Sequence, residues 1–245
     1  MKRGPQIFLP LPKTGIAFRP EFLDFKRGIR VGNLEESERI TKILKLSLEA
    51  RYQQSFVTER WGRGVYWQWI GFLPKANRLS KPISSHVSFG CAKYFITVDQ
   101  EKQLFECGMQ VERGYIEAPP EAPECQLRED WDWNRLLDAL QPGGPLEHEL
   151  KRLVLKEGFL VHGGAWEQQA SYSSRKNLPG VTKIRRQLEA APGDRWAGFQ
   201  IFYPMRENEV RASTGLDLVE SMLAAFDEVT PAMNLTMQIE LQPAG

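Results

Sequence analysis

Residues suited to ligand binding lie close together in an aromatic run over residues 61–72, WGRGVYWQWIGF. Trp67 and Trp69 are two positions apart, so a β-strand would place both rings on the same face. With Trp61 they could stack on a sugar, a nucleobase or a cationic head group, and the nearby Arg63 favours an anionic or aromatic ligand. The alternative is that these rings fill the core between a sheet and a helix, as large aromatic side chains usually do.

A second candidate site is the basic segment 172–186, YSSRKNLPGVTKIRR, which carries five positive charges and no acid. Serine hydroxyls accompany these charges, and Gly180 begins an expected helix whose free N–H groups could hold a phosphate. The alternative is an ordinary solvated surface, because runs of charge are usually that. The basic side chains are Arg175, Lys176, Lys183, Arg185 and Arg186.

Three residues belong to types that take part in nucleophilic catalysis: His86, Cys91 and His162. Sequence separation does not place an imidazole within hydrogen-bond distance of a thiol, and small thiols in strands are usually buried and structural. His162 begins a His-Gly-Gly sequence, but the chain has no G-x-S-x-G motif to supply the nucleophile. The sequence therefore assigns no catalytic residue.

Carboxylates at suitable spacing could also bind a metal ion. Glu106, Gln110 and Glu112 have even spacing, so they are expected to share one face of a strand, and we interpret them as the polar face of a half-exposed sheet. This region has no acid-x-Lys pattern, and no Cys/His grouping has metal-finger spacing. The sequence motifs for ATP, dinucleotide and zinc-protease sites do not occur either, so no metal and no cofactor are predicted.

Composition narrows the class of protein. The 245 residues include 32 Lys and Arg against 31 Asp and Glu, which gives a net charge of +1. A dedicated duplex-DNA binder usually has a larger basic excess, so nucleic acid stays open as a partner but is not favoured. Three cysteines without a disulfide framework, and no apolar run long enough to cross a membrane, indicate a soluble, cytoplasmic protein of bacterial type.

The pattern of elements predicts an α+β fold with a mostly antiparallel sheet and helices on one face. Alternating and aromatic runs indicate strands near residues 65–73, 86–98, 104–117 and 196–203. A polar five-residue connection suggests that the second and third of these form a hairpin. Apolar residues at helical spacing, with caps and stop signals, indicate helices over 34–59, 130–140, 146–156, 180–190 and from Ser213 or Thr214 to 229. Residues 159–179 are expected to be irregular, and the proline-rich residues 1–20 to form an extended arm.

Residues 1–245 are expected to form a single compact domain, with an internal division left open at the Pro- and Glu-rich segment 118–130. The function expected is that of a binding or regulatory protein. It would contact an anionic or aromatic ligand, such as a phosphate-containing partner, through the aromatic run and the basic segment. An enzyme with an unrecognised active site, or a nucleic-acid-associated protein using 172–186, are the alternatives.

Overall fold

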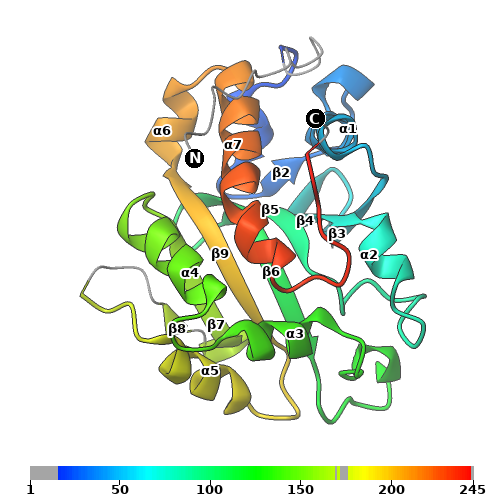
Figure 1. Cartoon of the computed structure of the whole chain (residues 1–245). Coiled ribbons are helices and arrows are strands. Elements are labelled where there is room, and N and C mark those ends of the chain that lie inside the picture. Colours follow the sequence, from blue (N-terminus) through cyan, green and yellow to red (C-terminus); the bar gives the residue numbers. More distant parts are fainter. Residues whose placement is uncertain (1–15, 169, 172–175, 244–245) are drawn as a thin grey trace.

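The computed structural model describes residues 16–168, 170–171 and 176–243 (Figure 1). Within these residues one sheet has the strand order β1-β2-β4-β5-β6-β9-β7-β8, with β3 paired to β4, and the paired strands run antiparallel. The strands are β1 Leu23–Asp24, β2 Gly28–Arg30, β3 Phe56–Arg63, β4 Tyr66–Pro74, β5 Lys93–Asp99, β6 Leu104–Gly114, β7 Leu160–Ala165, β8 Ala170–Ser171 and β9 Ala197–Arg206.

Helices pack on one face of this sheet, which confirms the α+β fold (Figure 1). The main core lies between the helices and this face, and α7 is central to it: Phe226 of α7 stacks on Tyr94 of β5 with ring centroids 4.7 Å apart. The helices are α1 Ile40–Tyr52, α2 Lys75–Leu79, α3 Asp132–Ala139, α4 Pro145–Leu155, α5 Val181–Glu189, α6 Glu207–Ala212 and α7 Gly215–Asn234.

The helix expected over residues 34–59 is wrong at both ends. It does not begin at residue 34, because the preceding Asn33 has a φ of 54° and a short 3-10 turn, Glu36–Glu38, precedes α1. At the other end α1 stops at Gln53, which is left-handed, and the chain continues as β3. Phe56 is buried in that strand, so its apolar character fits a strand as well as a helix, and pairing with β4 decides between them.

Two glycines, Gly62 and Gly64, shape the β3–β4 hairpin. Gly64 has a φ of 66° and begins the two-residue turn between the strands, a position that favours glycine in tight hairpins. Gly62 lies opposite a β-bulge: Trp61 pairs with Trp69, but Gly62 pairs with Trp67, so Gln68 is an extra residue on β4.

This bulge separates the two tryptophans that were expected to share a face. Trp67 packs against the core on the helix side of the sheet. Trp69 lies on the opposite face, where its ring covers Gly71. The expectation of a shared face is wrong because an extra residue between two positions reverses the alternation of side chains.

Other boundaries differ where pairing overrides the local pattern. The strand expected from residue 86 begins at Lys93, because turns occupy much of the preceding stretch. Residues 160–165, expected to be irregular, form β7 because they pair with β9 along their whole length. The final helix begins at the expected Thr214 cap, and it continues past Pro231 as far as Asn234, with Ala232 and Met233 buried in the core.

The face opposite the helices is also buried, although it carries polar side chains. Glu106, Gln110 and Glu112 share this face as expected. They are only 5%, 4% and 9% exposed, so the prediction that this face of the sheet is half-exposed is wrong. Large rings cover their neighbours, such as Trp69 over Gly71 and Trp166 against Gly198. We call this set the polar face: Lys93, Glu106, Gln110, Glu112, His162 and Gln200.

Candidate functional site

The strongest candidate site is a surface at one end of the sheet where arginines surround an aromatic ring. Tyr66 on β4 is the cross-strand partner of Arg30 on β2 and of Arg63 on β3. Cross-strand partners have side chains on the same face of a sheet, so the three form one row. The Arg27 guanidinium stacks over the Tyr66 ring at 4.2 Å.

Trp61 extends this row along β3. It lies two residues from Arg63 on the same strand, so the two side chains share a face. Its side chain is 72% exposed, far more than expected for a tryptophan that packs in a core. We call Arg27, Arg30, Trp61, Arg63 and Tyr66 the Arg–aromatic surface.

The charges on this surface are only partly neutralised. Arg27 forms an ion pair with Asp24 at 2.6 Å, whereas Arg63 forms none with any described residue. Arg30 donates from Nη2 to the carbonyl of Asn33 at 3.3 Å, but its buried Nε has no partner within the described part of the chain. The surface therefore has three guanidinium groups and one carboxylate, that of Asp24. The guanidinium groups retain N–H donors suited to an anion.

The two tryptophans of the sequence prediction have different surroundings. Trp67 carries the Arg60 guanidinium at 4.3 Å from its ring, and its indole N–H donates to the carbonyl of Gly64 at 3.3 Å. Trp69 lies 5.8 Å from the Lys93 ammonium, and its buried indole nitrogen lacks a partner among the described residues. Each ring stacks with a cation of this chain, so neither is as accessible as Trp61.

The basic segment lies in another part of the molecule. Lys183 and Arg186 are exposed on α5, Lys176 is exposed before it, and Arg185 pairs with Glu189 at 2.8 Å. Arg175 lies outside the described residues. Helix α5 packs on β7, and β5, β6 and β9 separate β7 from β4 in the sheet (Figure 1). The structure therefore does not bring the basic segment and the Trp-rich strand together.

The nucleophile candidates are not arranged for catalysis. Burial raises the pKa of Cys91 to about 12 and that of Cys125 to about 11, and it raises the pKa of Cys107 as well. Such thiols remain protonated at neutral pH, and the thiolate is the reactive form. His162 packs edge-on against Phe202 with ring centroids 4.7 Å apart.

Sequence reasoning missed Arg27, Arg30 and Tyr66 as members of a site. Arg27 and Arg30 lie about thirty residues before β3, and β2 has only three residues. A strand that short has too few positions to show a period of two. Trp61 and Arg63 were named from the sequence, where charge beside the aromatic run was the available signal.

Comparison with known proteins gives no relative: no family model, curated protein or solved structure matches this chain. Over the residues that the structure describes, no three His, Cys, Asp or Glu side chains group as a metal site. Within the same ranges, no helix combines the length and apolar character needed to cross a membrane.

Proposed function

We propose that this protein is a binding module that recognises a ligand carrying both a planar aromatic ring and a negative charge. The observation that carries the proposal is the row Arg30–Tyr66–Arg63, with Arg27 stacked on the tyrosine. Guanidinium groups stack on rings and hold anions by paired N–H donors, so one surface can read both features. The exposed Trp61 adds a second stacking platform.

The proposed role is binding without catalysis, and the buried, protonated thiols support it because they are poor nucleophiles. The free cysteines are buried, which suits a reducing cytoplasm as the proposed location. A mononucleotide contains both of the required features. Adenosine 5′-monophosphate is therefore the probe, with adenosine retaining the ring alone and ribose 5-phosphate retaining the anion alone.

The test is isothermal titration calorimetry of the whole chain with these three probes. We expect the nucleotide to bind about tenfold or more tightly than either fragment, since each half adds contacts of roughly 1–2 kcal/mol. Arg63→Ala and Tyr66→Leu are each expected to weaken nucleotide binding about tenfold. Added salt is expected to weaken the binding of ribose 5-phosphate more than that of adenosine.

The matched control is the double variant Lys183→Ala, Arg186→Ala, which removes two exposed charges on α5 and is expected to leave binding unchanged. If this control loses binding while Arg63→Ala retains it, the basic segment is the site and the proposal is wrong. Equal binding of the nucleotide and ribose 5-phosphate would show that the aromatic groups contribute nothing.

A further inference from the structure

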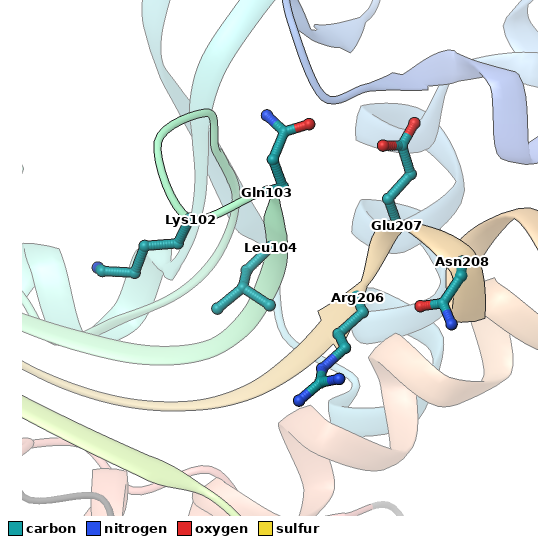
Figure 2. A pocket seen from close by; sticks show the side chains of 6 residues that line it. All are labelled: Lys102, Gln103, Leu104, Arg206, Glu207 and Asn208. Carbon is teal, nitrogen blue, oxygen red and sulfur yellow. The ribbon is translucent and has the colours of Figure 1, made fainter.

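An open cleft lies where β6 begins and β9 ends. Its volume is about 760 Å³, and it is lined by Lys102, Gln103, Leu104, Arg206, Glu207 and Asn208 (Figure 2). Figure 2 shows Lys102, Leu104 and Arg206 directed to one side, with Gln103 and Glu207 directed to the other. The first group thus presents two cations on either side of an apolar side chain.

Glu106 is the next residue on that side of β6. It is two positions from Leu104, so both side chains lie on the same face. Glu106 is only 5% exposed, and its Oε1 atom is buried without a hydrogen-bond partner in the described chain. A buried carboxyl oxygen without a donor is costly, so this atom is the clearest unmet hydrogen-bonding group near the cleft.

Neighbouring cations do not satisfy this carboxyl group. Arg206 pairs with Leu104 across the strands, two positions along from the Glu106–Pro204 pair, yet neither Glu106 nor Arg206 forms an ion pair with a described residue. Lys102 turns to Asp99 instead, at 2.8 Å. An acceptor and a cation thus lie on the same face of two paired strands without pairing with each other.

We propose that this cleft binds a small zwitterion, a molecule with an ammonium group and a carboxylate. Glu106 accepts hydrogen bonds from the ammonium group, and Arg206 holds the carboxylate with its guanidinium donors. Leu104 lies between them and contacts the carbon atoms that join the two charges. This site is separate from the Arg–aromatic surface, and it takes ligands of amino-acid type.

The ionisation of Glu106 distinguishes a zwitterion site from a site for anions alone, because the two should differ in how affinity changes with pH. Burial raises the pKa of Glu106 to about 7, an effect that Lys102 opposes and Asp99 reinforces. Arg206 lies on the same face, as do Lys93 and Glu112 farther along the strands. An ammonium group binds better to the ionised carboxylate, so zwitterion affinity should rise as the pH increases through 7. An anion alone would show the reverse, because the ionised carboxylate repels it.

The experiment titrates the whole chain with glycine, β-alanine and 4-aminobutyrate, which space the two charges differently, and with acetate and methylammonium as single-charge probes. Calorimetry at about pH 6 and about pH 8 brackets the pKa of Glu106. We expect at least one zwitterion to bind about tenfold more tightly than either single-charge probe, and more tightly at the higher pH.

Two variants test the assigned contacts. Glu106→Gln is expected to weaken zwitterion binding about tenfold and to remove its pH dependence, and Arg206→Gln to weaken it similarly while leaving a pH dependence. Arg186→Gln, which changes another exposed arginine, on α5, is the control and should bind as the wild type does. Circular dichroism shows that each variant is folded. Acetate binding that strengthens at low pH, or no binding of any zwitterion, would overturn the proposal.

Discussion

Glu106 and Glu112 lie on the same face of β6 but differ in whether other side chains bind them. Glu112 accepts from the Lys93 ammonium at 2.7 Å, and the side chain of Trp196 donates to it as well. Lys93 is fully buried and also reaches Glu59 at 2.8 Å. Burial raises the pKa of both Glu106 and Glu112, but among the described residues only Glu112 finds ion-pair and hydrogen-bond partners that offset the cost.

The stability of the folded protein should therefore depend on the protonation of Glu106. Its pKa is raised from 4.5 to about 7, so the folded state holds this proton more tightly than the unfolded chain. The free energy of unfolding consequently falls as the pH rises from about 4.5 to about 7, by roughly 3 kcal/mol from this group, and then levels off. Urea unfolding over this pH range measures the effect.

Glu106→Gln keeps the size of the side chain and cannot ionise. We expect this variant to be more stable than the wild type above pH 7 and to lose this part of the pH dependence. The difference between the two proteins isolates Glu106 from other titrating groups such as Asp227, whose pKa is raised to about 6. Parallel stability curves for the two proteins would show that Glu106 titrates normally.

At the scale of elements, the β-bulge at Gln68 decides which groups can act together. It places Trp67 on the helix side of the sheet and Trp69 over Gly71 on the polar face. A regular strand would have placed both rings together, as their spacing predicted. The bulge also leaves Trp61 and Arg63 on the face of Tyr66, which forms the Arg–aromatic surface.

Gly71 is required by the ring above it. A Cβ at this position would lie 2.3 Å from the nearest atom of the Trp69 ring, so the ring must move. We expect Gly71→Ala to lower the free energy of unfolding by about 1–3 kcal/mol, the usual cost of overpacking, and to change the tryptophan emission. Thermal unfolding and fluorescence measure these two effects.

Gly180 provides the control for that substitution. No atom lies within 4 Å of a Cβ built there, and the residue caps α5 with a φ of −63°, so Gly180→Ser should change stability by less than about 1 kcal/mol. If Gly71→Ala is as stable as this control, Trp69 is free to move and does not form a fixed cover of the polar face.

At the scale of the whole molecule, the main core takes residues from both sides of segment 118–130. Strand β6, before the segment, pairs with β9, after it, from Leu104 to Gly114. The two ends of the segment lie close together, because the backbone N–H of Leu127 donates to the carbonyl of Tyr115 at 2.7 Å. Contacts of this kind couple the two parts of the chain energetically.

We therefore expect one cooperative unfolding transition. Tryptophan fluorescence and far-ultraviolet circular dichroism should give the same midpoint in urea, because the shared β6–β9 pairing must break for either part to unfold. A chain cleaved within 118–130 should also remain assembled on a sizing column. Two separate transitions, or fragments that part after cleavage, would show that the division at 118–130 is real.

The sequence by itself determined the α+β class, the antiparallel β4–β5–β6 arrangement and the helices α3, α4, α5 and α7, since these depend on local periodicity and on capping residues such as Thr214. Only the tertiary structure decided the extent of α1, the existence of β7 and the separation of Trp67 from Trp69. These features depend on which strand each segment pairs with. The same is true of the candidate site, because Arg30 and Tyr66 meet only through the pairing of β2 with β4. The local sequence pattern indicates whether a side chain prefers a buried or an exposed environment. Contacts between distant segments decide which side chains come together in that environment.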